Sequence, residues 1–500
     1  MAGMTGAATT SRSNAVIGGV ALAGACLVGL VLAQEPLFVL GACLALLATA
    51  VNLYFPARLS RLFSIGMGVV LFGYAFLGRA FAYLGFPPFF VGEIVLATGL
   101  LSVLGRRRAI TLRSPALFAL VAFMAWGACR TVPYLGTYGM LALRDAVLWG
   151  YGVFVLLLVP LLLGPGRIET VVYWYRRCIP LFLVWAPVVV FLSRRIREYL
   201  PVAPDGSRLT FMKAGDGAVH LAGIAAFLVL GLDGPTRRRT RPAVPPWVIT
   251  GLWFVGALSV AALNRGGALA LLAAMLLLLV LRPVKLLPRF AGVVAVGATL
   301  GLVLTAGDVA VDLGHGRTLS VQQITDNLQS VVDPSEAPAL SGTREWRLRW
   351  WTAIVDYTIR GPYFWTGKGF GVNLAIDDGF QLARGRLRSP HNGHMSVLAR
   401  TGVPGAVLWL TLQATLAVLL IRTYVRARRA KDEWWERLSA WVLAYGLAML
   451  VNASFDIYLE GPQGGIWYWS VFALGTAVAS VYGGSAGERG SRRSLPRPVT

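Results

Sequence analysis

Charged residues are scarce in this chain of 500 residues. Asp, Glu, Lys and Arg together make up 14% of it, against about a quarter in ordinary soluble domains. Hydrophobic residues make up 56%, and the mean hydropathy is +0.65. A soluble fold of this length could not hide so many apolar side chains, because much of its surface must face water. The shortage of charge therefore excludes a soluble enzyme and a disordered chain, and it indicates a protein that crosses a membrane several times.

Acidic residues and cysteines are the next shortages. There are 23 Asp and Glu against 46 Lys and Arg, which gives a net charge of +23. Each of the four cysteines (Cys26, Cys43, Cys129 and Cys178) lies inside an apolar stretch, whereas a disulfide framework would place pairs of them in loops. They are typical of small buried hydrophobic residues. The basic excess has no accompanying nucleic-acid-binding motif, so we expect no nucleic acid partner.

Long apolar runs recur along the whole chain. A helix needs about 20 mostly apolar residues to cross the hydrocarbon, and backbone groups in lipid need partners within the helix. The runs therefore predict an all-α fold, a polytopic transmembrane helical bundle of about 12–14 spans, with one large extracytoplasmic loop that contains short helices. The candidate spans are 15–33, 37–54, 63–84, 90–104, 115–130, 142–163, 172–192, 217–232, 247–263, 267–281, 290–306, 395–421, 438–459 and 464–482.

The runs and the charges between them predict the organisation of the chain. The expected parts are N-terminal transmembrane helices in 1–192, transmembrane helices with a basic outer loop in 193–306, a large extracytoplasmic loop in 307–394, C-terminal transmembrane helices in 395–482 and a cytoplasmic tail in 483–500. Starting with the N-terminus inside and alternating, more than half of the cations fall in the inner segments. This positive-inside pattern predicts a multi-pass protein of the inner (cytoplasmic) membrane with both termini in the cytoplasm.

Two outer regions, 193–216 and 307–394, carry basic residues against this rule. They are either a solvated basic surface near lipid headgroups or a binding site for an anionic substrate at the outer surface. Charges within spans are costly and often functional. The candidates are Arg79, Glu93, Arg144, Asp145, Arg176, Arg177, Asp216, His220, Arg265, Arg400 and Asp456. We interpret Arg144 and Asp145 as a structural pair, and Arg265, in a tight outer turn, as able to reach an outward-facing cavity.

Three features stand out in the long outer loop. Between Ser341 and Ile359, apolar side chains recur with helical spacing at Trp346, Trp350, Ile354 and Tyr357, which predicts an amphipathic helix at the membrane interface. The segment Arg360–Gly371 is rich in glycine and predicts a loop whose backbone can approach a ligand. His391 and His394 follow where the loop re-enters the membrane. Their spacing allows a metal pair, but further ligands are not evident, so a general base or hydrogen-bond donor is favoured.

These residues resemble the O-antigen ligase and polymerase family. The likeness covers about 208 to 410 and consists of an Arg-x-x-x-Trp motif before Pro and a Gly-rich turn, a His-Asn motif with Gly eleven residues after the His, and a Ser-Arg-Gly turn in which Ser is replaced by Asn. The residues that carry it are Arg347, Trp351, Pro362, Gly367, Gly369 and Gly371 in the first motif, His391, Asn392, Met395 and Gly402 in the second, and Asn264, Arg265 and Gly266 in the third.

The resemblance implies a metal-independent, inverting glycosyltransferase without a cofactor. Its expected partners are a glycan donor on undecaprenyl pyrophosphate, an acceptor hydroxyl on a glycan, on a lipid A core or on a protein, and the lipid bilayer, with the active site facing the periplasm or exterior. Arginine suits the donor, since its guanidinium pairs with phosphate through two hydrogen bonds. The expected catalytic residues are His391, Arg347 and Arg265, and the expected substrate-binding residues are Arg344, Arg208, Lys213, Asn392, Trp351 and Gly369.

Several alternatives stay open at this point. His391 either takes the proton of the acceptor hydroxyl or donates a hydrogen bond to the pyrophosphate, and Arg344 could take the role assigned to Arg347. Polymerase, ligase and protein O-oligosaccharyltransferase share the same chemistry, and we favour a polymerase. The alternative of another class is a non-enzymatic flippase or transporter of lipid-linked oligosaccharide, which would distribute its charges along a central pathway.

Overall fold

The computed structural model describes residues 56–86, 89–104, 114–195, 197–199, 212–232, 245–282, 338–382 and 387–494, with a few positions between 292 and 319. Nearly all of the described chain is helical, as the composition predicts. The predicted spans 15–33 and 37–54, and all but isolated positions of 290–306, lie outside the described residues.

The chain divides into two compact units. The first comprises residues 1–70 and 87–110, and its described part contains the first turns of α3 (Pro56–Ala82), β2 (Phe89–Phe90) and α4 (Val91–Leu104). The helices pack closely here, because a Cβ atom at Gly66 would lie 3.0 Å from a methyl group of Val95.

The second unit comprises residues 71–86 and 111–500. It contains the end of α3 with β1 (Gly85–Phe86), and then α5 (Pro115–Thr131), η1 (Val132–Tyr134), α6 (Leu135–Tyr138), α7 (Met140–Gly150), α8 (Val153–Leu162), α9 (Arg167–Arg195), η2 (Arg197–Tyr199), α10 (Ala214–Val229), α11 (Pro246–Leu263), α12 (Arg265–Leu281), β3 (Val311–Asp312), β4 (Thr318–Leu319), α15 (Pro338–Ile359), α16 (Leu374–Asp377), α17 (Gly393–Arg429), α18 (Glu433–Ala453), η4 (Tyr458–Glu460) and α19 (Pro462–Ser494). Strands β3 and β4 form one antiparallel pair.

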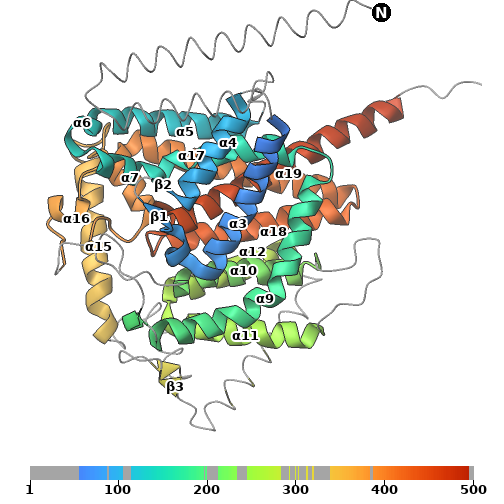
Figure 1. Ribbon diagram of the computed structural model, residues 1–500, viewed down its shortest axis with the longest axis horizontal. Helices are drawn as coiled ribbons and strands as arrows, with labels where there is room; N and C mark the ends of the chain where they lie inside the picture. The colour runs from blue at the N-terminus through green and yellow to red at the C-terminus, as the bar shows by residue number, and fades with distance from the viewer. Residues whose placement is uncertain are drawn as a thin grey trace, which may run out of the picture. The chain divides into compact units, whose positions relative to one another are not determined.

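The helices of the second unit form a bundle. Figure 1 shows α5, α10, α12, α17 and α18 side by side, with α15 running across their left-hand ends. Small residues let α10 and α12 approach closely, since a Cβ atom at Gly267 would lie 2.6 Å from the Cβ of Ala218, which is typical of helices packed within membranes. Trp409, Trp441 and Trp469 are fully buried in the core.

Among the described residues, five helical segments are long and apolar enough to cross a membrane. They are Arg58–Ala82, Pro115–Tyr138, Met140–Leu162, Gly393–Arg429 and Pro462–Gly484. Shorter apolar helices include Val91–Val103, Ala214–Val229, Val248–Val260 and Arg265–Leu281. Each predicted span from 63–84 to 267–281, and each after 395, overlaps a helix. The helical class is therefore confirmed, whereas the count of 12–14 spans stays a prediction.

One local prediction is wrong. Helix α18 ends at Ala453, so Asp456 lies in a connecting loop and not inside a span 438–459. Asp145, which we interpreted as half of a structural pair with Arg144, has long-range partners: its Oδ2 accepts a hydrogen bond from Arg388 at 3.1 Å and forms an ion pair with Arg400 at 3.0 Å. Both side chains come from segments more than 200 residues further along the chain, and both hold the loop before α17 against α7.

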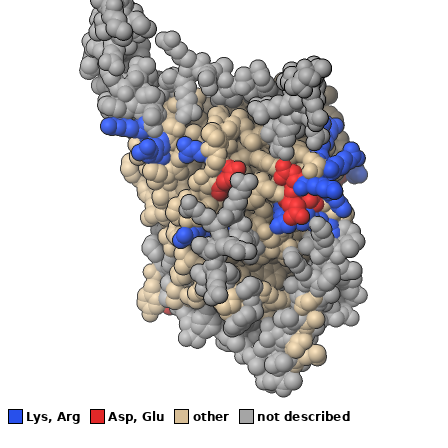
Figure 2. All heavy atoms as spheres, turned by 90° about the vertical axis from the view of Figure 1, so that its right-hand side faces the viewer, with Lys and Arg blue, Asp and Glu red and all other residues tan. Residues whose placement is uncertain are grey.

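Basic side chains gather at the end of the bundle where α17 ends and α18 begins. The last turn of α17 carries Arg426, Arg428 and Arg429, and Figure 2 looks onto this end, at the right-hand side of Figure 1. Nearby, Arg282 and Glu436 form a buried ion pair at 2.7 Å that joins the end of α12 to α18. Cations collected at one end of apolar helices are what the positive-inside pattern predicts.

Candidate functional site

A short loop after α18 carries a carboxylate fixed by the backbone. The carbonyl of Asn452 accepts hydrogen bonds from the amides of Phe455 and Asp456 at 3.0 and 3.1 Å, which turns the chain out of the helix. The Oδ1 atom of Asp456 then accepts from the amide of Ile457 at 2.8 Å. The side chain of Asp456 is only 15% exposed, so its orientation is set by this local geometry.

Four of the predicted site residues meet around this loop. Lys213 Nζ lies 3.5 Å from Asp456 Oδ2, and His391 Nδ1 lies 3.9 Å from Asp456 Oδ1. Arg347 Nη1 donates to the carbonyl of Phe455 at 3.0 Å. Arg265 adjoins them, because Gly266 packs directly on Phe455 and the charge of Arg265 acts on the guanidinium of Arg347. We call Lys213, Arg265, Arg347, His391 and Asp456 the Asp456 cluster.

Electrostatics within the Asp456 cluster fix its charge state. Burial would raise the pKa of the Asp456 carboxyl, but Lys213 and His391 outweigh it and hold that pKa well below its usual range. Burial would lower the pKa of the Lys213 ammonium, but Asp456 and Asp216 raise it above its ordinary value. Burial, with a contribution from Arg265, lowers the pKa of Arg347. At neutral pH the carboxylate is therefore ionised, and cations outnumber it.

Three helices begin at the Asp456 cluster. Lys213 directly precedes α10, Arg265 is the first residue of α12, and α17 starts two residues after His391. The side chain of Asn264 caps α12 by accepting from the amide of Gly267 at 2.8 Å. Helix N-termini carry partial positive charge and unpaired N–H groups that favour anions. The cluster is thus electropositive through both its side chains and its backbone.

His391 is held in an unusual backbone conformation. Its φ is +53°, in the left-handed region that residues other than glycine rarely adopt. The residues on either side are tied down: the carbonyl of Pro390 accepts from Trp351 Nε1 at 2.9 Å, and Asn392 Oδ1 caps α17 by accepting from the amides of His394 and Met395. Such strained positions cluster at functional sites. Trp351 and Asn392 therefore lie where they orient His391.

His394 differs from His391 in having both ring nitrogens engaged. Trp409 Nε1 donates to Nδ1 at 3.0 Å, so Nε2 must carry the proton and donate to the carbonyl of Leu450 at 3.0 Å. This arrangement makes His394 a neutral packing residue and removes it from the predicted metal pair. No group of three His, Cys, Asp or Glu side chains suited to a metal ion occurs in the described part of the chain.

The glycine-rich loop after α15 packs against the protein. Gly369 and Gly371 have φ of +78° and +97°, and a Cβ atom on either would collide with the ring of Tyr134 or Tyr138. The loop also follows α17, since the amide of Gly369 donates to the carbonyl of Arg400 at 3.0 Å. Close packing accounts for these glycines, and the predicted contact of Gly369 with substrate stays a prediction.

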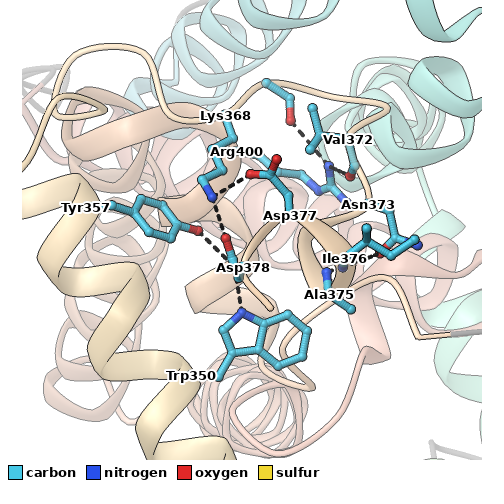
Figure 3. A network of polar contacts seen from close by, with 11 residues as sticks. Trp350, Tyr357, Lys368, Val372, Asn373, Ala375, Ile376, Asp377, Asp378 and Arg400 are labelled. Carbon is cyan, nitrogen blue, oxygen red and sulfur yellow. Dashed lines mark hydrogen bonds and ion pairs between the residues drawn. The ribbon is translucent and has the colours of Figure 1, made fainter. Parts of the chain in front are cut away.

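Asp378 ties this loop to α15, the helix that carries Arg347 (Figure 3). It accepts hydrogen bonds from Trp350 Nε1 at 2.6 Å, from the Tyr357 hydroxyl at 3.3 Å and from Lys368 Nζ at 2.5 Å. The ammonium of Lys368 also lies 4.2 Å from the centre of the Tyr357 ring. Trp350 and Ile354 are fully buried on the face of α15 that the helical spacing predicts. The network thereby sets where Arg347 stands.

Asp378→Ala should lower the free energy of unfolding by about 3 kcal/mol, because it leaves the buried Trp350 indole, the half-buried Tyr357 hydroxyl and the Lys368 ammonium with fewer acceptors. The side chain of Asp378 is 1% exposed. The matched control is Asp356→Ala, which removes an exposed i,i+4 pair with Arg360 and should cost less than about 0.5 kcal/mol. Thermal unfolding in detergent measures both, and equal stabilities would contradict the role of the network.

The remaining predicted residues are placed as follows. Arg344 is exposed, one turn before Arg347 on α15, and Arg208 lies outside the described residues.

Sequence reasoning missed Asp456 as the centre of the site, although its charge within an apolar stretch was a signal. It also missed Glu460, whose carboxylate accepts from Ser396 at 2.5 Å and whose pKa burial raises. Glu460 thereby supports the first turn of α17 through Ser396.

One comparison with known proteins finds a match over part of the chain. Residues 250–410 match the family model described as O-Antigen ligase, a range that includes Arg265, Arg347 and His391. No curated protein matches the chain. Together with the apolar helices, the match indicates a multi-pass membrane protein that acts in ligation or polymerisation of glycans. Residues 250–410 thus carry the pattern of the O-antigen ligase family, in agreement with the motifs in the sequence.

Proposed function

We propose that the protein is a metal-independent, inverting glycosyltransferase that acts on a glycan linked to undecaprenyl pyrophosphate at the outer face of the cytoplasmic membrane. One observation carries the proposal. Lys213, Arg265, Arg347 and His391 come from four separate segments and converge with Asp456 at a point where three helices begin. Three cations and one histidine around an ordered carboxylate suit a diphosphate leaving group beside a base.

The cations bind the pyrophosphate of the donor. Arg347 uses Nη1 to hold the carbonyl of Phe455, while its Nε is buried and has no hydrogen-bond partner among the described residues. The guanidinium is thereby oriented, and Lys213 and Arg265 add positive charge beside it. As the bond from the anomeric carbon to the pyrophosphate breaks, negative charge grows on the leaving oxygen, and groups fixed beforehand stabilise it without reorganising.

His391 acts as the general base. Its Nδ1 faces Asp456, which leaves Nε2 for the acceptor. The acceptor oxygen attacks the anomeric carbon, the carbon–oxygen bond to the pyrophosphate breaks, and the hydroxyl proton passes to Nε2. Asp456 stabilises the imidazolium that results, so it is a positioning residue. We assign Trp351 and Asn392 to the same task, since their hydrogen bonds fix the residues on either side of His391.

The charges at the two ends of the bundle support an orientation for the protein in the membrane. The Asp456 cluster lies at the starts of α10, α12 and α17, and the last turn of α17 carries the basic side chains. The positive-inside rule supports assigning the basic end to the cytoplasm. The cluster would then open to the periplasm or exterior, where lipid-linked glycans are exposed after translocation.

Purified protein in liposomes, supplied only with lipid-linked glycan repeats, should form polymer and release undecaprenyl pyrophosphate. Activity should persist in EDTA, because side-chain cations stabilise the leaving group. Polymer that appears without another acceptor identifies a polymerase, and product that requires lipid A core or protein identifies a ligase or an O-oligosaccharyltransferase. Movement of labelled lipid-linked glycan across the bilayer without any new glycosidic bond would overturn the proposal in favour of a flippase.

A further inference from the structure

An apolar cavity of about 270 Å³ lies among α10, α11 and α12. Its walls include Leu228 from α10, Trp253 from α11, and Leu271, Met275 and Leu278 from α12. Trp253 is fixed as part of the wall, because its Nε1 donates to the carbonyl of Leu221 at 3.0 Å. Almost no polar surface lines the cavity, so it suits a hydrocarbon chain and not a sugar.

The cavity is closed on one side and open on the other. Its lining runs from the core to the surface of the bundle: Leu278 is 1% exposed, whereas Leu272 is 43% exposed. A cavity that opens sideways from a helix bundle can be entered by a chain that is already in the bilayer.

The cavity and the Asp456 cluster share two helices. Lys213 precedes α10 and Arg265 begins α12, and the wall residues follow further along both helices. With a rise of 1.5 Å per residue, Leu271 and Leu278 lie about 9 and 20 Å beyond Arg265 along the axis of α12. Cations therefore stand at one end of these helices and an apolar chamber stands near the other end.

We propose that this cavity binds the polyprenyl chain of the lipid-linked donor, an inference that rests on the function proposed above. An amphiphile with its anionic head at Lys213 and Arg265 would reach the cavity with a chain that continues for 9–20 Å along α12. A diphosphate on a long isoprenoid chain meets both demands. Burial of the chain contributes affinity that a short-chain diphosphate lacks, since apolar burial scales with area.

Met275→Trp tests the proposal by filling the cavity. The probes are undecaprenyl diphosphate and geranyl diphosphate, both without glycan, and their affinities are measured by competition in phosphatidylglycerol vesicles. Met275→Trp should weaken binding of undecaprenyl diphosphate at least tenfold and leave geranyl diphosphate unchanged. The matched control is Leu276→Trp, because Leu276 is the next residue on α12, does not line the cavity and is 47% exposed. It should bind both probes like wild type.

Other outcomes are equally decisive. Wild-type affinity for undecaprenyl diphosphate in Met275→Trp, or an equal loss in Leu276→Trp, would overturn the proposal. If the Met275→Trp protein does not insert into the membrane, two experiments take its place. One is the same binding measurement on Leu271→Phe, and the other is cross-linking of a photoreactive undecaprenyl diphosphate to the wild-type protein. Cross-links outside α10–α12, or labelling of the cavity only by a photoreactive phospholipid, would also overturn it. These measurements need no glycan transfer. If the cavity binds the chain selectively but the protein forms no glycosidic bond, the proposed function is refuted and the proposed chain-binding site stands.

Discussion

His391→Ala is expected to lower the rate of glycan transfer by about 10²–10⁴-fold, the contribution typical of a positioned general base. The substitution removes the only nitrogen proposed to accept the acceptor proton, and it leaves the cations of the Asp456 cluster in place. Donor binding should therefore change little while turnover is lost. The measurement is the initial rate of polymer formation in liposomes, set beside the affinity for lipid-linked donor.

His394→Ala is the control for this result. It removes two hydrogen bonds from a packing residue, so thermal stability should fall while the rate per folded molecule stays near that of wild type. Polymer of normal length from His391→Ala would refute the assignment of the base. A loss of donor affinity with unchanged turnover at saturating donor would instead show that His391 binds the pyrophosphate.

Arg347→Ala is expected to weaken binding of the lipid-linked donor by roughly 10–100-fold, because hydrogen bonds to charged groups contribute about 1.5–3 kcal/mol. Arg347 is half-buried and bonded to the carbonyl of Phe455, so its guanidinium is already oriented. Titration of detergent-solubilised protein with labelled donor, at fixed ionic strength, gives the affinity directly.

Arg344→Ala is the matched control, since Arg344 lies one turn earlier on α15 and is exposed. Its loss should change donor affinity less than about threefold and should act mainly at low salt. This pair of variants also decides between the two arginines that the sequence left open. Equal losses in both variants, or none in Arg347→Ala, would contradict the pyrophosphate clamp.

The helices could be predicted well because their signal is local. Every candidate span from 63–84 to 267–281, and every one after 395, overlaps a helix. The four-residue spacing of Trp346, Trp350 and Ile354 predicted the buried face of α15. The boundary of α18 was wrong for a physical reason. Phe455 and Ile457 extend the apolar pattern beyond Ala453, and a buried loop has the same composition as the end of a membrane helix.

The site could be predicted only in part because its contacts are long-range. The residue types of His391, Arg265, Arg347 and Lys213 indicated an anion site, but their meeting around Asp456 depends on how distant helices pack. The same is true of Asp145, whose partners follow more than 200 residues later. The substrate contacts of Trp351 and Asn392 stay predictions. Asn392 caps α17, which Asn directly before a helix indicates locally, whereas the hydrogen bond from Trp351 to the carbonyl of Pro390 is long-range and has no sequence pattern.

The left-handed backbone conformation of His391 affects the stability of the protein as well as the proposed activity. A left-handed conformation at a residue other than glycine costs on the order of 1–3 kcal/mol, which the neighbouring hydrogen bonds must offset. Glycine would adopt the same φ without strain. Selection for stability alone would therefore favour glycine at this position, and under the proposed function a folded, thermally robust but inert protein lies one substitution away. The histidine persists there only as long as the chemistry is under selection.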